Sequence, residues 1–274
     1  VLFFIISHFR AFEKGIWKSK LNPNKKGLVE FKNVSLTYSG SGAPSVEGIN
    51  FKAMKGQTIG VIGGTGSGKS SLVNLIPRLY DATQGEVLVD GVNIKDLTFD
   101  TLYSKVALVP QKAELFSDTV KDNVTFGKND ATDEDVKNAI SIAQAEEFVS
   151  KLEDKENHMI AERGNNLSGG QKQRMCIARA LVRNSEIVIF DDSFSALDYK
   201  TDAVLRKELK KHTKDATNLI VAQRIGTIMN ADKILVLDNG ECVGIGTHKE
   251  LLKSCEVYKQ IALSQLSKEE LENV

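Results

Sequence analysis

The sequence predicts an α/β fold: a phosphate-loop NTPase core with a mainly parallel sheet, an antiparallel β subdomain and an inserted α-helical subdomain. Apolar strand patterns alternate with helical patterns along most of the 274 residues, as parallel sheets require. Strand and turn signals at 28–62 and 85–97 indicate the antiparallel subdomain. A largely helical stretch, 117–152, interrupts the alternation and predicts the inserted helices.

The core elements follow from apolar runs and capping residues. Strands of the parallel sheet are expected at 58–62, 187–190, 219–222 and 234–237, with helices such as 201–211 between them. Within the inserted subdomain, a helix is expected to start at Thr132 and to be capped toward Asp135. Another helix should begin at Thr247, after Gly246.

A glycine-rich loop lies between the strand 58–62 and a helix that starts near Lys69 and carries Leu72, Val73, Leu75 and Ile76 on its inner side. It fits G-x-x-x-x-G-K-[S/T] and comprises Gly63, Gly64, Thr65, Gly66, Ser67, Gly68, Lys69 and Ser70. Glycines let the backbone N–H groups turn inward around phosphates, while Lys69 supplies a charge and Ser70 a hydroxyl for magnesium. A plain glycine-rich turn is the alternative, but the strand–loop–helix setting favours nucleoside triphosphate binding.

A second motif, Leu-Ser-Gly-Gly-Gln at 167–171, precedes the helical pattern 172–181. That pattern runs into the apolar strand 187–190, which ends at Asp191 and Asp192. A Ser-Gly-Gly turn at a helix start can bind an anion, because free N–H groups and the positive end of the helix dipole face outward. An ordinary helix cap would look the same.

Together these residues resemble the ATP-binding cassette family, in which the LSGGQ signature contacts ATP held by the opposite subunit. The resemblance covers about 27–263, with every landmark in the family's order. It implies that the chain binds ATP and Mg²⁺, with Tyr38 stacking on adenine, unless Tyr38 is only a half-buried strand residue. Besides the loop residues, the implied nucleotide-binding set is Tyr38, Ser71, Ser168, Gly169, Gly170 and Gln171.

The resemblance also assigns metal-binding and catalytic roles. Asp191 corresponds to the Walker B carboxylate, which holds Mg²⁺ through water together with Ser70. Gln111 matches the glutamine that reaches the metal and the attacking water, although from the residues alone it is only a polar loop residue after a strand. The segment 195–198 is similar to the loop through which two nucleotide sites communicate.

Two catalytic positions depart from the family's pattern. Asp192 stands where the family has a glutamate, the candidate general base, and Gln223 stands where it has a histidine that contacts the γ-phosphate. Asp lacks one methylene, so its carboxylate falls short by about an ångström, a misplacement that can cost on the order of a hundredfold in rate. Gln donates a hydrogen bond but cannot be protonated. We therefore expect intact ATP binding and weakened hydrolysis, with Lys69, Gln111, Asp192 and Gln223 as the catalytic set.

This asymmetry resembles one half of a heterodimeric exporter with a degenerate site, because the signature is intact and can complete a partner's site. One alternative is a homodimer in which Asp192 works as a slower base. Another is a regulatory subunit that binds ATP and hardly hydrolyses it. A cassette ATPase acting on nucleic acid or ribosomes is disfavoured, because 36 basic and 36 acidic residues cancel.

Two segments point to an exporter. Residues 115–124 and 161–164 are similar to exporter forms, and in the latter Glu162 would meet the coupling helices of membrane domains. From charge alone, Glu162 would be an unpartnered surface residue. The implied partners are a second nucleotide-binding subunit and exporter transmembrane domains, without nucleic acid. The expected location is the cytoplasmic face of the cell membrane, and multidrug export is favoured by analogy alone.

Composition and termini complete the predictions. Hydrophobic residues make up 41% of the chain, enough for a packed core. Three cysteines show no paired or metal-ligand spacing, which suits a reducing cytoplasm. We expect the nucleotide-binding domain at 27–264 and a tail at 265–274. Residues 1–26 are either an untidy lead or the end of a truncated membrane domain, because their apolar run is too short to span a bilayer.

Overall fold

The computed structural model describes residues 27–128 and 130–266 and contains two sheets. The smaller is antiparallel, with strand order β2-β1-β4-β5. Its strands are β1 (Val29–Leu36), β2 (Val46–Ala53), β4 (Gln84–Val89) and β5 (Val92–Asn93). The antiparallel subdomain predicted from the turn signals is therefore confirmed. The expectations for 1–26 and for most of the tail lie outside the described residues.

The larger sheet has the order β10-β9-β3-β8-β7-β6, and every pairing except β9 with β10 is parallel. Its strands are β3 (Thr58–Gly63), β6 (Val106–Val109), β7 (Ile187–Asp191), β8 (Thr217–Val221), β9 (Lys233–Asp238) and β10 (Glu241–Gly246). In a parallel sheet the carboxyl ends of the strands meet at one edge. This edge gathers the segments that follow β3, β6, β7 and β8.

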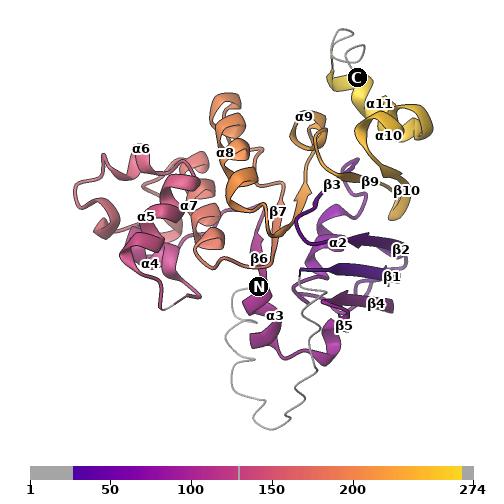
Figure 1. Cartoon of the computed structure of the whole chain (residues 1–274), viewed down its shortest axis with the longest axis horizontal. Coiled ribbons are helices and arrows are strands. Elements are labelled where there is room, and N and C mark those ends of the chain that lie inside the picture. The colour runs from indigo at the N-terminus through magenta and orange to yellow at the C-terminus, as the bar shows by residue number, and fades with distance from the viewer. Residues whose placement is uncertain (1–26, 129, 267–274) are drawn as a thin grey trace.

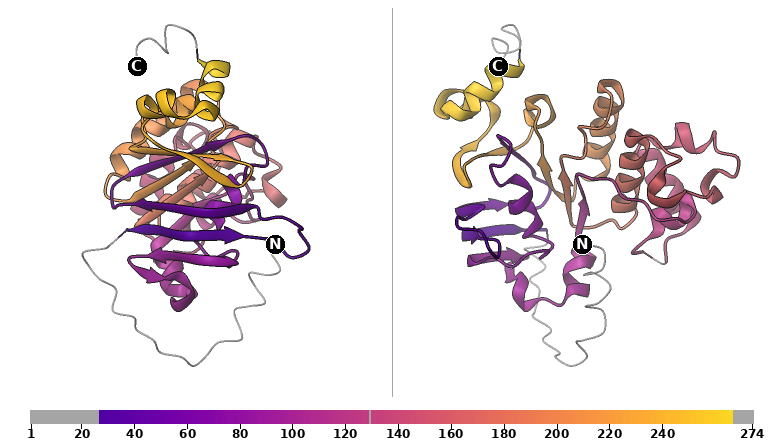
Figure 2. Two further views of the ribbon diagram at one scale, coloured as in Figure 1. Left: turned by 90° about the vertical axis from the view of Figure 1, so that its right-hand side faces the viewer. Right: turned by 180° about the vertical axis from the view of Figure 1, so that it is seen from behind.

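Helices cover both faces of the larger sheet. They are α2 (Lys69–Asn74), α3 (Phe99–Lys105), α4 (Val120–Thr125), α5 (Asp133–Ile142), α6 (Glu146–Val149), α7 (Gly169–Leu181), α8 (Tyr199–His212), α9 (Ile225–Ile228), α10 (His248–Ser254) and α11 (Glu256–Gln265). Short 3-10 turns occupy η3 (Ile94–Asp96), η4 (Lys155–Asn157) and η5 (Glu162–Gly164). Figures 1 and 2 show the smaller sheet and α2 on one side of β6 and β7, and α4 to α7 on the other.

Strand β7 shows how the residue alternation builds these layers. All five of its residues are buried. Ile187 and Ile189 pack into the core between the two sheets, whereas Val188 and Phe190 pack against the helices of the other face. A strand buried on both sides reads as a continuous apolar run, which is why the sequence predicts it well.

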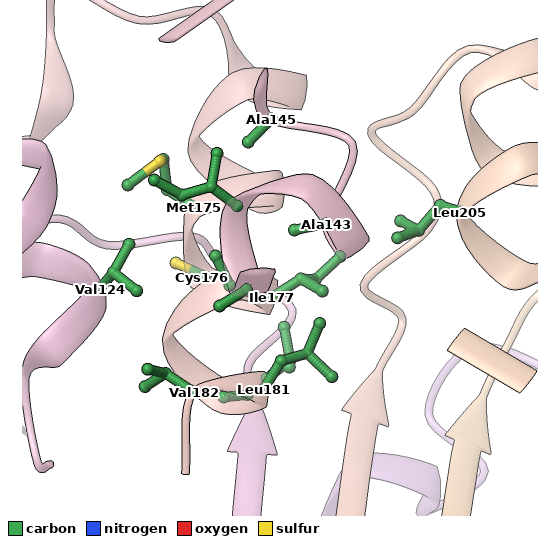
Figure 3. Close-up of a cluster of buried hydrophobic side chains, with 14 of the residues drawn as sticks. Val124, Ala143, Ala145, Met175, Cys176, Ile177, Leu181, Val182 and Leu205 are labelled. Carbon is green, nitrogen blue, oxygen red and sulfur yellow. The ribbon is translucent and has the colours of Figure 1, made fainter. Parts of the chain in front are cut away.

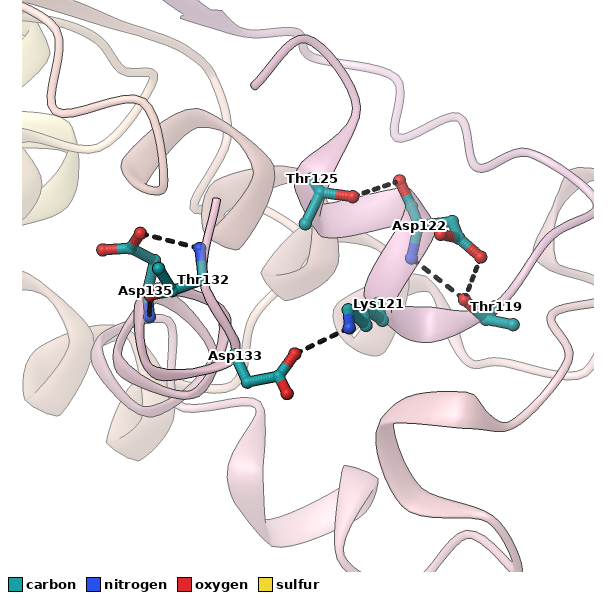
Figure 4. Close-up of polar contacts among 7 residues, drawn as sticks. All are labelled: Thr119, Lys121, Asp122, Thr125, Thr132, Asp133 and Asp135. Atoms are coloured by element: carbon teal, nitrogen blue, oxygen red, sulfur yellow. Dashed lines mark hydrogen bonds and ion pairs between the residues drawn. The ribbon is translucent and has the colours of Figure 1, made fainter. Parts of the chain in front are cut away.

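The inserted subdomain is a helical cluster rather than one continuous helix. Its apolar side chains converge on α7, as Figure 3 shows for Met175, Cys176, Ile177 and Val124. Thr132 caps α5 with the predicted reciprocal bonds to Asp135. Figure 4 shows this capping box beside the ion pair that joins α4 to α5, in which Lys121 Nζ lies 2.6 Å from Asp133 Oδ1.

The end of helix α2 was predicted wrongly. Helix α2 ends at Asn74, so Leu75 and Ile76 follow the helix instead of lying within it, although both are fully buried. Pro77 explains the early end, because proline cannot donate to the helix and disfavours helical geometry in the residue before it.

Among the described residues, no helix combines the length and apolar character needed to cross a bilayer.

Candidate nucleotide-binding site

The glycine-rich loop begins at the end of β3 and runs into α2, at the edge of the sheet where parallel strands end. A Cβ on Gly63 would overlap the backbone carbonyl oxygen of Leu237, and Gly68, with φ of 94°, could not accept a side chain without clashing with Ser45. At Gly64, by contrast, a Cβ would meet nothing within 4 Å. Two glycines are therefore required by packing, while Gly64 leaves open space where a ligand could approach the backbone.

Lys69 folds back over this loop. Its Nζ donates to the carbonyl oxygens of Gly63 at 2.9 Å and Gly64 at 2.7 Å. Burial lowers the pKa of Lys69, against the attraction of the Asp192 and Asp191 carboxylates. The structure thus holds the ammonium group at the loop that the sequence predicts to bind phosphates.

Ser70 and Asp191 meet although 121 residues separate them. The Ser70 hydroxyl donates to Asp191 Oδ1 at 2.9 Å. Asp191 ends β7 and is only 6% exposed, and burial raises the pKa of its carboxyl group, with a further upward contribution from Asp192. A hydroxyl and a carboxylate oxygen are hard ligands, and Mg²⁺ commonly takes one or two protein oxygens beside phosphates and water. The pair therefore fits the predicted Mg²⁺ role.

Asp192 lies next to this pair but has different partners. Its Oδ2 accepts a hydrogen bond from Gln223 Nε2 at 2.7 Å and one from Gln111 Nε2 at 3.3 Å. Its backbone has φ of 45°, a left-handed conformation that Asp tolerates better than most residues. Three predicted catalytic residues, each following a different strand, thus converge on one carboxylate. Gln111, predicted also as a metal contact, reaches Asp192 and makes no hydrogen bond to Asp191.

Tyr38 lies beside the loop helix. Its hydroxyl donates to Ser71 Oγ at 3.0 Å, and its ring meets Tyr80 edge-on, with centroids 4.9 Å apart. Tyr80 is 43% exposed and was not predicted as a site residue, because nothing in the local pattern distinguishes it. The structure thus places the predicted adenine-stacking residue and Ser71 in one group, with a second aromatic ring beside them.

The signature residues form the N-terminus of α7. Ser168 caps this helix, and Gln171 returns the bond by accepting from the Ser168 N–H at 2.8 Å. A Cβ on Gly169 would again meet nothing within 4 Å, whereas one on Gly170 would lie 3.3 Å from the Ala196 carbonyl oxygen. Between 168–171 and the loop 63–70, the described residues make no hydrogen bond. The two predicted anion-binding elements are therefore not joined into one site by hydrogen bonds among the described residues.

The exporter-like segments have different environments. Asn123, 1% exposed, bonds to the backbone of Phe116, and Arg179 from α7 donates to the Asn123 side chain at 2.8 Å. Hydrogen bonds thus connect the segment 115–124 to α7, the helix that begins with the signature residues. Glu162 is exposed in η5 and makes no side-chain hydrogen bond or ion pair with the described part of the chain.

Fold and site together define a phosphate-loop nucleotide-binding protein with a signature helix in an inserted helical subdomain. A family model described as ABC transporter matches residues 46–195. The chain therefore belongs to the ABC transporter family.

Relatives and solved structures agree with this assignment. A putative multidrug export ATP-binding/permease protein of Staphylococcus aureus strain NCTC 8325 / PS 47 is 44% identical over 237 residues, which cover 86% of this chain and 41% of that protein. The corresponding protein of the bovine strain RF122 / ET3-1 is 43% identical over the same length. A bacterial Atm1-family ABC exporter with ATP bound superposes with a TM-score of 0.87 and 31% identity, covering 97% of this chain and 47% of that one.

These likenesses confirm the exporter-type ATP-binding domain that the sequence predicts, and with it the ATPase class of the domain. The chain spans only 41% of the length of the curated relatives it matches. Their names describe proteins that combine ATP-binding and permease parts.

Proposed function

We propose that this chain is the ATP-binding and ATP-hydrolysing part that powers an exporter at the cytoplasmic face of the cell membrane. Its own site hydrolyses ATP slowly, while its intact signature completes the site of a different partner subunit. The observation that carries the proposal is the environment of Asp192, whose carboxylate is bound by Gln223 and Gln111.

The weak hydrolysis follows from that environment. The Asp192 carboxylate is one methylene shorter than the glutamate expected in the family, so it reaches less far toward an attacking water. Gln223 directs its amide N–H at the same carboxylate oxygen at 2.7 Å. A base whose lone pairs accept hydrogen bonds from two amides is less available to take a proton. Both departures therefore act on one chemical step.

Nucleotide binding depends on other groups. Lys69 and the loop N–H groups bind the phosphates, Tyr38 stacks on the adenine, and Ser70 with Asp191 holds Mg²⁺. The metal, when bound, neutralises charge on the phosphates. None of these side chains departs from the family's pattern, and Ser70 and Asp191 already contact each other.

The open face at Gly169 supports the role of the signature toward a second subunit. Nothing inside the chain requires glycine there, because a Cβ would meet no atom within 4 Å. A glycine at a helix N-terminus lets phosphate oxygens approach the backbone N–H groups. The exposed Glu162 would face the coupling helices of the transmembrane domains. Drug-like compounds are the substrate class that the names of the relatives suggest.

Two alternatives use the same site. In a homodimer, Asp192 itself would be the base, and its fixed orientation by two amides favours a defined if slow role. In a regulatory subunit, the chain would bind ATP with negligible hydrolysis.

A paired comparison in the assembled transporter separates the proposal from the homodimer. Gly169→Asp places a carboxylate where ATP phosphates would lie, and an acidic residue at a helix N-terminus does not destabilise the helix. Gly42→Asp is the matched control, because Gly42 is also exposed with nothing within 4 Å of its Cβ. We expect Gly169→Asp to lower total ATP turnover at least about tenfold, and Asp192→Asn to change it less than about twofold. Large and equal losses from both variants would contradict the proposal and favour the homodimer.

A further inference from the structure

The last residue of α11 contacts the turn that carries Gln223. Gln265 Nε2 donates to the Gln223 carbonyl oxygen at 2.8 Å, and Gln265 Oε1 accepts from the Ile225 N–H at 2.8 Å. One side-chain amide thus bonds to both sides of Arg224, as a neighbouring strand would.

This double contact fixes the backbone of the turn. Arg224 is held in an extended conformation, with φ of −105° and ψ of 128°, immediately before α9 begins. Two hydrogen bonds from one planar amide restrain the peptide groups on both sides of Arg224. The direction in which the Gln223 side chain leaves the backbone is then set, and that side chain reaches Asp192 Oδ2 at 2.7 Å.

Helix α11, which carries Gln265, is packed into the apolar core. Tyr258 and Ala262 are fully buried, and they share an apolar cluster with Ile225 and Ile228 of α9. The Tyr258 hydroxyl also lies 2.6 Å from His248 Nδ1, which joins α11 to α10. Burial of this kind stabilises the docking of α11 on the sheet. The position of Gln265 is therefore set by the core and not by the exposed turn itself.

We infer that Gln265 is a positioning residue: by holding the backbone at Gln223 and Ile225, it sets the hydrogen bond between Gln223 and Asp192. The inference rests on the proposed function, in which that pair governs slow hydrolysis. It extends the site to the last residue of α11, 42 positions beyond Gln223 in sequence.

The test compares Gln265→Ala with Gln260→Ala in the complete transporter that contains this chain. Gln260 is an exposed glutamine of the same helix whose side chain has no hydrogen bond within the described residues. Hydrogen exchange of the segment 217–228 within the intact protein reports on the turn. We expect faster exchange at the Ile225 amide in Gln265→Ala and unchanged exchange in Gln260→Ala. Unchanged exchange in both variants would overturn the inference.

Kinetics then separate positioning from general stability. Gln265→Ala should raise kcat at this chain's site by about three- to tenfold, because a weaker bond from Gln223 leaves the Asp192 carboxylate more available as a base. KM for ATP should stay unchanged, because the phosphate loop is untouched. In a Gln223→Ala background the same substitution should have no further effect on kcat. A change in kcat that persists in that background, or a fall in kcat in the unmodified background, would show a merely structural role and overturn the inference.

The proposed function fails in a different way. If no turnover at this chain's site depends on Lys69, hydrolysis there is refuted, while the exchange result still decides whether Gln265 fixes the turn. Hydrolysis at this chain's site is measured separately as a single turnover of bound ATP, with the partner's site inactivated.

Discussion

Asp191 and Asp192 are neighbours in sequence and both are buried, yet their side chains have different hydrogen-bond partners. Asp191 bonds with the hydroxyl of Ser70 in the loop helix, and Asp192 accepts hydrogen bonds from the amides of Gln223 and Gln111. The first pair holds the residues expected to bind Mg²⁺, whereas the second holds the two residues that are expected to weaken hydrolysis. Under the proposed function, nucleotide binding and hydrolysis therefore depend on separate contacts, so substitutions should affect one without the other.

The largest effect should come from the binding side. Lys69→Ala removes the ammonium group that contacts the loop, and a charge-assisted contact to phosphate contributes about 1.5–3 kcal/mol. We expect ATP affinity to fall by about a hundredfold in a nucleotide titration. Lys210→Ala, an exposed lysine of α8, is the control and should leave affinity unchanged. Equal affinity in Lys69→Ala and the unmodified chain would remove the phosphate-loop assignment.

The next effect should be confined to the hydrolysis side. Asp192→Glu combined with Gln223→His restores the reach of the base and a protonatable partner. Turnover at this chain's site should rise by about tenfold to a hundredfold, with ATP affinity nearly constant. Measuring both quantities on one preparation makes the comparison sharp. A double variant with unchanged turnover would mean that some other feature limits the site.

A smaller effect concerns the cost of burying Asp191. Burial raises the pKa of its carboxyl group in the folded chain. The folded state therefore holds this proton more tightly than the unfolded state, so the associated stability is present below the unfolded pKa and is lost as pH rises through the folded pKa.

Without nucleotide at neutral pH, Asp191→Asn should raise the unfolding temperature by about one to three degrees. The same variant should gain less stabilisation from Mg²⁺ and ATP, because it lacks the carboxylate. A thermal scan with and without Mg-ATP measures both. A lower unfolding temperature of the nucleotide-free variant would contradict this explanation of the pKa shift.

The smallest effect on the nucleotide site is expected when the helical subdomain is perturbed without touching either carboxylate. Thr132→Ala breaks the capping box of α5 and should lower the free energy of unfolding by about 1 kcal/mol in urea. ATP affinity should stay the same. Ser150→Ala, which removes only a bond to the carbonyl three residues earlier, is a mild control. Weaker ATP binding in Thr132→Ala would show that the subdomain and the loop are coupled.

The features that the sequence predicted correctly are those that depend on local residue patterns. The phosphate loop, the capping box at Thr132 and the apolar strand β7 depend on residues close together in sequence. Other features arise only from tertiary contacts: the bond from Tyr38 to Ser71 spans 33 residues, and Gln265 reaches Gln223 across 42. No periodicity or motif indicates that a glutamine at a helix end will form hydrogen bonds with the backbone of a distant turn. The end of α2 was misplaced because apolar spacing continues past the residue where Pro77 stops the helix.

The most direct test of the account is ATP hydrolysis measured beside ATP binding on the same preparation of this chain, with Lys69→Ala as the control. The account predicts Lys69-dependent binding with little turnover, because Asp192 and Gln223 form a poor hydrolytic pair. Rapid Lys69-dependent turnover by the unmodified chain would contradict it, and a homodimeric ATPase using Asp192 as its base would be the simpler explanation.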